Sequence, residues 1–533
     1  MLRLLVALTL VAAPAAAASP AAIEAHTRFL SDDLLEGRGL GTRGHEVAAA
    51  YVASQFAALG LVPAGSDGWL QRITFQRRSQ ASARETLTLN GRVFVNGPDL
   101  AVGPGTAAGP EIVEAGLVFV GFGLAAASLG IDDYAGVDVR GRIVVAISGA
   151  PLGLDSEVGA SLAASKGEAA AKRGAIGLVQ VRSAAELARR PWDKVAPTAR
   201  RPAYNWLNPD GSIDPAATAL RFTATANDGL AVALFERAAV GFASLRAEVA
   251  ASPLARPKGF ALAGTLRLDR ATSLDRVTSP NVIGVLPGNK PVLRDEVVLL
   301  TAHADHLGIR AHPSGDTIYN GAQDNAAGVA MLLEAARALA AGKPLARSVM
   351  FLVTTAEEVG LQGADYFARH PTVALSRIVS EVDLDMPILA CSFGTIVPYG
   401  ASHSTLGRDV AAIAAGMNIG ISPDPQPVEA IFTRSDHYRL VRAGIPALFI
   451  KTGPGDDRGG EACGAADKAF RARQYHEPSD DMSLAFDWAA AARFTDLNVA
   501  LTRRIANARA RPRWYQGDFF GETFAPKAAK AVR

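Results

Sequence analysis

From about Ser279 toward the C-terminal region, apolar runs of strand length alternate with stretches of helical periodicity. The strand-like runs are NVIGVLPG, EVVLLTAHADHLG, SVMFLVTTAEE, RIVSEVDLDMP and IPALFIKTG. Helical stretches such as DNAAGVAMLLEAARALAAG and TLGRDVAAIAAGM lie between them. Long apolar strands that alternate with helices predict an α/β fold, in which helices flank a mostly parallel central sheet. Ligands of such sheets bind beyond the carboxyl ends of the strands.

Two segments with different sequence patterns precede this region. Residues 21–63 have apolar residues at helical spacing, and the segment that follows, to about Pro104, is rich in strand-like and turn residues. Residues 106–264 contain the β-rich runs IVVAIS and GLVQV around a helix-like stretch, and they contain no histidine. We interpret 106–264 as an inserted, smaller, β-rich α/β domain. Residues 19–105 then form the N-terminal part of the main domain, and residues 265–533 form the rest with a C-terminal tail.

The N-terminal segment MLRLLVALTLVAAPAAAASPAA has the layout of a secretory signal peptide. Arg3 lies near the start, an apolar stretch follows, and small residues lead up to Ser19. The apolar stretch is short for a membrane span, although an uncleaved anchor is the alternative interpretation. We expect residues 1–18 to be a signal peptide and the mature chain to be exported, either periplasmic or secreted.

Composition excludes several classes of partner. Charged residues make up 20% of the chain and the formal net charge is +2, so no strong charge field favours nucleic acid or an acidic membrane surface. The chain has two cysteines, Cys391 and Cys463, which form either one disulfide or two buried thiols. Two cysteines cannot supply a tetrahedral thiolate zinc site, so a metal here must use histidine and carboxylate ligands.

Acidic and imidazole side chains recur directly after the predicted strands and near the C-terminal end. Each has an ordinary structural explanation, such as a helix N-cap for Asp324 or a hydrogen-bonded core histidine for His303. Their recurrence at equivalent strand ends would instead gather them in one crevice. The residues concerned are His303, Asp305, Asp324, Glu357, Glu358, Asp385 and His476.

These residue types suit a site with two metal ions. Two imidazoles and three carboxylates can hold two divalent zinc ions if one carboxylate bridges them, and such a site activates a water molecule. A further carboxylate must take that water's proton and deliver it to a leaving amine. The adjacent glutamates Glu357 and Glu358 fit such a division between proton transfer and metal binding. Asp305 is placed two residues after His303, where it can accept the ring N–H of that histidine.

The ordered set of motifs resembles a known family. HADHLG, YNGAQDNAAGVA, TTAEEVGLQG, DLDM, SDHY and YHEPSDD resemble, in this order, the zinc-dependent aminopeptidase family that also includes glutamate carboxypeptidase and the transferrin receptor. The N-terminal DDLLEGRGLGTRGHEVAAAYVASQF looks similar to that family too. The segment from DYAGVDVRGRIVVAISG to KGEAAAKRGAIGLVQV resembles the protease-associated domain often inserted in these enzymes.

The resemblance implies a role for each residue of the site. His303 and Asp385 would bind one zinc, and Asp324 would bridge two zinc ions per chain. Glu358 would bind the second zinc together with His476, and Glu357 would be the general base and acid. The implied activity is that of a two-zinc exopeptidase, with a peptide substrate as partner, no nucleic acid, no membrane beyond export, and an open question of a homodimer.

The sequence departs from the family pattern at two places. Asp383 stands where the family often has Asn, and it would attract a free amino terminus or hydrogen-bond nearby backbone. Some secreted members have a tyrosine before SDH that stabilises an oxyanion, but this chain has Phe432 and Thr433 in that segment. Tyr438 is a candidate for that role, with packing as the favoured interpretation.

Other functions on the same scaffold need different features. A carboxypeptidase or dipeptidase needs a positive group for a free substrate carboxylate, and Arg434 is a candidate. Glutaminyl cyclisation uses the same fold with one zinc, which the full set of ligands disfavours. A non-catalytic binding protein, like the transferrin receptor, would lack ligands that this chain retains.

Overall fold

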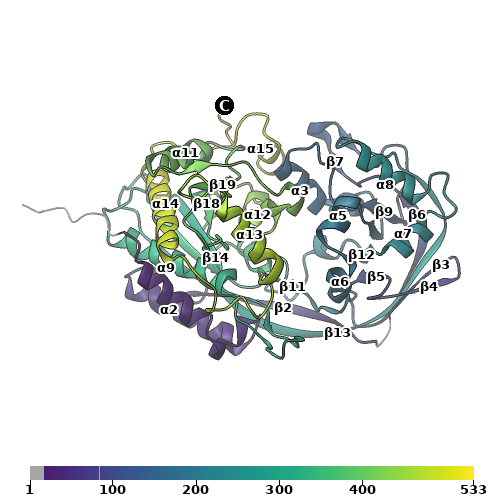
Figure 1. Ribbon diagram of the computed structural model, residues 1–533, viewed down its shortest axis with the longest axis horizontal. Helices are drawn as coiled ribbons and strands as arrows, with labels where there is room; N and C mark the ends of the chain where they lie inside the picture. Colours follow the sequence, from purple (N-terminus) through teal and green to yellow (C-terminus); the bar gives the residue numbers. More distant parts are fainter. Residues whose placement is uncertain (1–16, 83–84) are drawn as a thin grey trace, which may run out of the picture.

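The computed structural model describes residues 17–82 and 85–533, so the predicted signal peptide lies almost wholly outside the described residues. The chain forms two lobes that lie side by side (Figure 1). We call the lobe that holds the C-terminal half the main lobe and the other the smaller lobe. Within the described part of the chain, no helix is both long and apolar enough to cross a membrane.

The main lobe is built on a central sheet whose middle strands are parallel. In spatial order these are β17 (Ser348–Thr354), β14 (Val297–His303), β18 (Ile378–Asp383) and β21 (Ala447–Thr452). All residues of β14, β17 and β18 are buried, as expected for parallel strands that are covered on both faces. At the edges, β13 (Phe260–Leu286) is antiparallel to β17, and β19 (Thr395–Tyr399) is antiparallel to β21 and pairs with β20 (Gly420–Ile421).

Helices cover both faces of this sheet. Val298 and Leu300 of β14 belong to one core cluster, while Val297 and Leu299 belong to another, because successive side chains of a strand point to opposite faces. The first face packs against α1 (Pro20–Leu30), α2 (Arg43–Ala58), α9 (Ala327–Ala340), α11 (Leu406–Gly416) and α14 (Trp488–Asn507). The second packs against α10 (Gln362–Arg369) and α12 (His437–Arg442). The predicted α/β fold with a mostly parallel, helix-flanked sheet is confirmed.

The smaller lobe contains a second α/β arrangement. Its parallel strands, in spatial order, are β6 (Gly109–Phe119), β9 (Ile143–Ile147), β10 (Gly177–Val181) and β12 (Phe222–Ala226), and β5 (Leu100–Val102) is antiparallel to β12. Its helices are α3 (Ser156–Ala164), α4 (Lys166–Lys172), α5 (Ala184–Arg189), α6 (Trp192–Val195), α7 (Asp228–Leu234) and α8 (Phe242–Ala251).

One long strand joins the two lobes. β13 has 27 residues, pairs with β6 in the smaller lobe and then with β2 (Leu70–Gln80) and β17, and runs along the lower side of Figure 1. β3 (Thr86–Leu89) also pairs with β13 and with β4 (Arg92–Val95), and β11 (Ala203–Trp206) pairs with β2. β13 crosses the predicted boundary at 264, so the domain boundaries stay predictions.

The remaining elements are β1 (Val62–Pro63), β7 (Ala125–Ala126), β8 (Ile131–Asp132), β15 (Gly308–Ile309), β16 (Ile318–Tyr319), α13 (Ala462–Arg473) and α15 (Phe519–Phe524).

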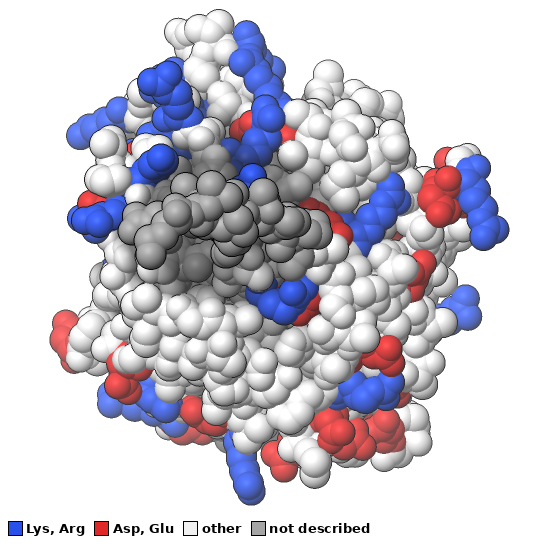
Figure 2. Space-filling model, turned by 90° about the vertical axis from the view of Figure 1, so that its left-hand side faces the viewer, with Lys and Arg blue, Asp and Glu red and all other residues white. Residues whose placement is uncertain are grey.

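Charged side chains of both signs are interspersed on the face that Figure 2 shows, in keeping with the small net charge.

Cys391 and Cys463 are bonded to each other, with Cα atoms 5.5 Å apart. The bond links the segment after β18 to α13 and closes a sequence separation of 72 residues. Loop-closure entropy for such a separation corresponds to about 4 kcal/mol of stability. We expect the double substitution C391S/C463S to lower the free energy of unfolding by about 2–4 kcal/mol in guanidinium denaturation. A loss below about 0.5 kcal/mol would contradict the entropic account.

An ion-paired histidine connects the smaller lobe, the main lobe and the C-terminal tail. Nδ1 of His403 lies 2.7 Å from Asp518, and Nε2 lies 2.7 Å from Glu157 on α3. Burial disfavours the charged ring, but hydrogen bonds to Asp518 and Glu157 outweigh it and raise the pKa of His403 to about 9. The ring therefore stays charged at neutral pH.

We expect the contribution of the His403 ion pairs to the free energy of unfolding to depend on pH. Because the folded pKa of His403 lies above the unfolded value, the pairing stabilises fully below about pH 6.5 and is lost as pH rises through 9. We expect His403→Gln to cost up to about 3 kcal/mol at pH 6 and much less at pH 9.5. Guanidinium denaturation of both proteins at both pH values measures this, and a loss that is equal at the two values would refute it.

Candidate metal centre

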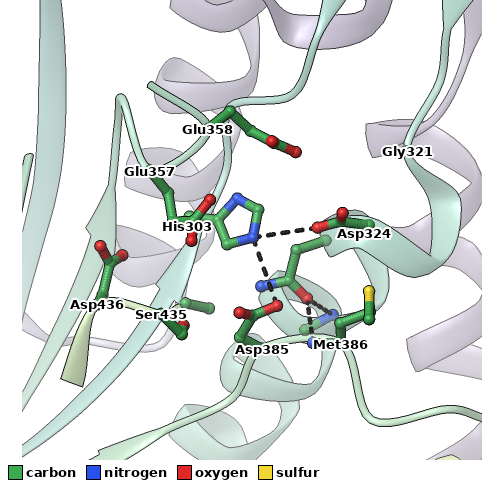
Figure 3. Close-up of polar contacts among 12 residues, drawn as sticks. His303, Gly321, Asp324, Glu357, Glu358, Asp385, Met386, Ser435 and Asp436 are labelled. Carbon is green, nitrogen blue, oxygen red and sulfur yellow. Dashed lines mark hydrogen bonds and ion pairs between the residues drawn. The ribbon is translucent and has the colours of Figure 1, made fainter. Parts of the chain in front are cut away.

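The residues singled out at the strand ends converge at one edge of the main sheet. His303 is the last residue of β14, while the two glutamates follow β17 and Asp385 follows β18. Because these three strands are parallel neighbours, their carboxyl ends meet at the same edge. Asp324 comes from η5 (Ala322–Ala326), a short π-helical turn before α9. Figure 3 shows the acidic side chains arranged around the imidazole of His303.

Asp324 lies between two histidines from distant parts of the chain. Its Oδ1 lies 3.3 Å from Nε2 of His303, and its Oδ2 lies 3.2 Å from Nε2 of His476. Each histidine has a further acidic neighbour. Asp385 lies 3.5 Å from Nε2 of His303, and Glu358 lies 3.1 Å from Nε2 of His476. The set therefore divides into two groups of donors that share Asp324.

The spacing of these donors fits metal ions. Two ligand atoms on one tetrahedral zinc, at about 2.0–2.2 Å from it, lie about 3.3 Å apart. The four separations between Nε2 of His303 or His476 and the carboxylate oxygens beside them run from 3.1 to 3.5 Å. Imidazole nitrogen and carboxylate oxygen are ligands that zinc accepts. The residues present therefore fit zinc, which His303, Asp385, Asp324, Glu358 and His476 would hold.

His306 adds a third imidazole beside Glu358. The ring is buried, and its Nδ1 lies 2.7 Å from Oε1 of Glu358. Ligand-type atoms of His306, Asp324 and Glu358 all lie within 4.8 Å of one another. Among the described residues, neither ring nitrogen of His306 nor Oε1 of Glu358 has a hydrogen bond of good geometry. The 2.7 Å separation is that of a direct contact and is shorter than the spacing of two ligands on one zinc, so His306 holds the Glu358 carboxylate in place through these two atoms.

Glu357 occupies a different position from Glu358. One carboxylate oxygen of Glu357 lies within 4.8 Å of ligand-type atoms of His303 and Asp385. All three residues line a small cavity at the site. Burial raises the pKa of Glu357 well above its usual range; His303 opposes this, and Glu358 adds to it. Such an environment favours a carboxyl group that exchanges a proton. The positions of the two glutamates therefore fit the predicted division between proton transfer by Glu357 and metal binding by Glu358. The roles themselves stay predictions.

The ring of His303 bonds the main-chain carbonyl of Asp305, not the carboxylate that was expected. Nδ1 of His303 hydrogen-bonds the main-chain carbonyl of Asp305, at 3.0 Å, while the nearest carboxylate oxygen is 4.0 Å away. The Asp305 carboxylate instead accepts from the main-chain N–H groups of Glu357 and Glu358, at 3.0 and 3.3 Å. Asp305 therefore orients the histidine with its backbone and the glutamate turn with its side chain.

Two residues that were not predicted as site residues hold the turn that carries Asp324. Asp480 accepts from the main-chain N–H groups of Gln323 and Asp324, at 2.8 and 3.0 Å. Arg38 is buried and donates to the carbonyls of Asn320, at 2.7 Å, and Gly321, at 3.0 Å. Their signals were present in the sequence, because Asp480 belongs to YHEPSDD and Arg38 to DDLLEGRG.

The departures from the family pattern have structural explanations. Asp383 is buried and accepts hydrogen bonds from Thr301 and Ser435, at 2.8 and 2.5 Å, so it belongs to a network beneath the site. Tyr438 is buried and its hydroxyl pairs with Ser161 of the smaller lobe at 2.9 Å. Its position is thus that of a packed side chain.

The small cavity at the site also has basic and aromatic walls. Arg434, Lys451, Arg471 and Tyr475 line it together with the acidic residues. The ring of Tyr475 stacks on His476 with centroids 3.8 Å apart, and Arg434 Nη2 donates to the tyrosine oxygen at 3.1 Å. Arg434 was expected as a candidate for the site, whereas Tyr475 was not, although it stands next to His476 in the sequence.

Comparison with solved structures agrees with this architecture. An aminopeptidase from Aneurinibacillus sp. strain AM-1 is 18% identical, with a TM-score of 0.51, and the match covers 93% of this chain and 95% of that one. A zinc aminopeptidase from Bacillus subtilis is 17% identical with a TM-score of 0.43, covering 92% and 97%. A peptidase M28 precursor from Shewanella amazonensis SB2B is 16% identical with a TM-score of 0.43, covering 92% and 96%. The first of these shows that the fold is shared.

The sequence pattern of one family covers the part of the chain that carries the site. Residues 281–502 match "Peptidase family M28", and this range contains His303, Asp324, Glu357, Asp385 and His476. The shared fold, the placement of the site and the match over residues 281–502 therefore agree: this part of the chain is similar to peptidase family M28.

Proposed function

We propose that this peptidase is a binuclear zinc exopeptidase that removes N-terminal residues from peptides. The observation that carries the proposal is the position of Asp324, whose two oxygens lie 3.3 and 3.2 Å from Nε2 of His303 and His476. His303, Asp324 and Asp385 would hold one zinc, and Asp324, Glu358 and His476 would hold the other. The name of the structural relative from Aneurinibacillus, an aminopeptidase, supports the same class of substrate.

The residues around the metals have separable tasks in this proposal. Two zinc ions, when bound, supply Lewis acidity and lower the pKa of water. Glu357 accepts a proton at its carboxylate and returns it to the leaving amine. Among the described residues, no ion pair engages that carboxylate, in contrast to Glu358, so it is free to take and release a proton.

We propose that Tyr475 stabilises negative charge on the reacting carbonyl oxygen. Arg434 donates to the tyrosine oxygen, so the hydroxyl proton remains available for a hydrogen bond into the cavity. Removing one such donor commonly lowers kcat by about 10²–10³-fold. We expect Tyr475→Phe to lower kcat by that factor with little change in zinc content. Unchanged kcat for leucyl-p-nitroanilide would exclude Tyr475 from this role.

A dipeptidase or carboxypeptidase is the second candidate, and the basic wall of the cavity favours it. Arg434, Lys451 and Arg471 line the cavity beside the acidic site, where they could attract a free substrate carboxylate. Arg434 already donates to Glu429, at 3.0 Å, and to Tyr475, which weakens its claim to that role. We therefore rank aminopeptidase activity first.

One set of substrates separates these candidates. The zinc-loaded protein would be assayed with leucyl-p-nitroanilide, its N-acetylated form, a free dipeptide and the matching dipeptide amide. Cleavage of the anilide and of both dipeptide forms, with no cleavage of the acetylated compound, is expected. Cleavage of the free dipeptide alone would establish a dipeptidase, and release of C-terminal residues from blocked peptides would establish a carboxypeptidase.

The inserted region and the destination of the protein remain proposals as well. We propose that residues 106–264 are a protease-associated domain, on the motifs given above. Export is proposed from the N-terminal pattern, and the Cys391–Cys463 bond supports it because disulfides persist in oxidising compartments. A peptide substrate is the proposed partner.

A further inference from the structure

A second, much larger cavity lies outside the metal centre, between the smaller lobe and the segment 427–433. Its volume is about 470 Å³, which falls within the range of small-molecule sites. Ser148 follows β9 and Arg182 follows β10, and both line the cavity. β9, β10 and β12 are parallel, so the cavity lies at the carboxyl edge of the smaller sheet, where α/β sheets bind their ligands.

The cavity wall contains two arginines that form no ion pair with any other described residue. Arg182 is only 3% exposed; its Nη2 donates to the carbonyl of Glu186 at 2.9 Å, and its Nη1 has no partner within residues 17–82 and 85–533. Arg190, also on the wall, donates to the carbonyl of Lys194 and forms no ion pair in that part of the chain. A buried guanidinium with an unused N–H favours an anionic oxygen ligand.

Part of the cavity wall is apolar. Phe122, Leu154, Val195 and Val249 contribute to it. Acidic residues on the wall are already engaged, because Glu186 is paired with Arg189 at 3.0 Å and Asp155 caps α3. The matching ligand therefore combines a carboxylate with an apolar group. A small amino acid derivative or the C-terminal end of a short peptide has this chemistry.

A series of contacts connects this cavity to the metal centre. Arg189 lies 3.4 Å from Glu429, which lies 3.0 Å from Arg434. Arg434 donates to Tyr475, and the ring of Tyr475 stacks on His476. The segment that carries Glu429 and Arg434 also forms a wall of both cavities, with Ala430 and Thr433 on the large one and Ile431 and Arg434 on the small one.

We propose that the large cavity binds apolar carboxylates, with the carboxylate on Arg182 and Arg190 and the apolar group against Phe122 and Leu154. The ligand is either the C-terminal end of a bound peptide or a free amino acid released by hydrolysis. Only this identification of its source rests on the proposed peptidase specificity. The binding site itself rests on the cavity, the unused Nη1 of buried Arg182, the nearby Arg190 that forms no ion pair among the described residues, and the apolar part of the wall.

Calorimetry with N-acetyl-leucine tests the site without any hydrolysis. The zinc-loaded protein is titrated with N-acetyl-leucine and with N-acetyl-leucinamide, which lacks the carboxylate. We expect the acid to bind at least ten-fold more tightly than the amide. We also expect Arg182→Met and, separately, Arg190→Met to weaken binding of the acid at least ten-fold, while Arg237→Met, an exposed arginine elsewhere in the smaller lobe, leaves it unchanged.

The outcomes separate this site from the metal centre. Absence of binding, or binding that both cavity variants leave unchanged, would overturn the proposal, since the latter places the carboxylate elsewhere. Thermal denaturation identifies a variant that fails to fold, and the second variant then decides. Because the probe is not hydrolysed, a failed aminopeptidase assay leaves this test intact.

Steady-state kinetics distinguish the two sources of the ligand. If the peptide's own end docks in the cavity, Arg182→Met raises KM for a leucyl tripeptide with a free C-terminus but not for its amide. If a released amino acid docks there, N-acetyl-leucine changes the hydrolysis of leucyl-p-nitroanilide by the wild type, and Arg182→Met abolishes that change. Either result supports the site.

Discussion

Replacing Glu357 with glutamine is expected to lower kcat by about 10²–10⁴-fold while the zinc content stays at the wild-type level. Glutamine keeps the size of the side chain but cannot accept the proton from water. The carboxylate of Glu357 makes no ion pair among the described residues, so its loss leaves the groups that surround the metals in place. Elemental analysis and hydrolysis of leucyl-p-nitroanilide measure both quantities on the same sample.

Glu358→Gln is the matched control for this result, because it changes the neighbouring residue in the same way. Glu358 lies 3.1 Å from His476 and 2.7 Å from His306, so its loss should lower zinc content as well as activity. Equal zinc loss in both variants would contradict the division of roles between the two glutamates. So would full activity of Glu357→Gln.

Replacing Asp324 with alanine is expected to remove zinc from both positions and to lower activity by more than about 10³-fold. Asp324 is the one residue of the set that lies within 3.3 Å of both His303 and His476, so its loss deprives each metal of a ligand. Loss of even a group that only supports a ligand commonly costs 10–100-fold in metal affinity. Zinc titration of the metal-free variant, followed by calorimetry, measures the loss at each site.

Asp383→Asn provides the matched control for Asp324, since both residues are buried acids near the site. Asp383 bonds to Thr301 and Ser435, outside the two donor groups, and should retain both zinc ions when changed. An Asp324→Ala protein that lost one zinc and kept the other at wild-type affinity would show that Asp324 does not bridge.

The sequence was sufficient to predict the architecture of the main lobe. Buried parallel strands read as continuous apolar runs, and β14, β17 and β18 are buried at every residue. The extent of the smaller lobe was harder to predict, because β13 continues through both lobes and the sequence offers no break where one lobe ends. Strand pairs such as β3 with β13 depend on contacts between residues far apart in the chain.

Much of the candidate site could also be anticipated, since parallel strands bring their carboxyl ends to one edge. The spacing of residues in the sequence did not determine which atoms form the hydrogen bonds of the site. The sequence placed Asp305 beside His303, but the bond is made by the main-chain carbonyl, and side-chain rotamers cannot be read from spacing. His306 reaches the site through a buried contact with Glu358 that the sequence does not encode locally.

The number of zinc ions needed for activity tests the two-metal centre directly. Metal-free protein would be titrated with zinc while hydrolysis of leucyl-p-nitroanilide is followed. Asp324 between His303 and His476 predicts two tightly bound zinc ions per chain, with full activity reached at two equivalents. Full activity at one equivalent, with no second tight site in calorimetry, would contradict the two-metal centre.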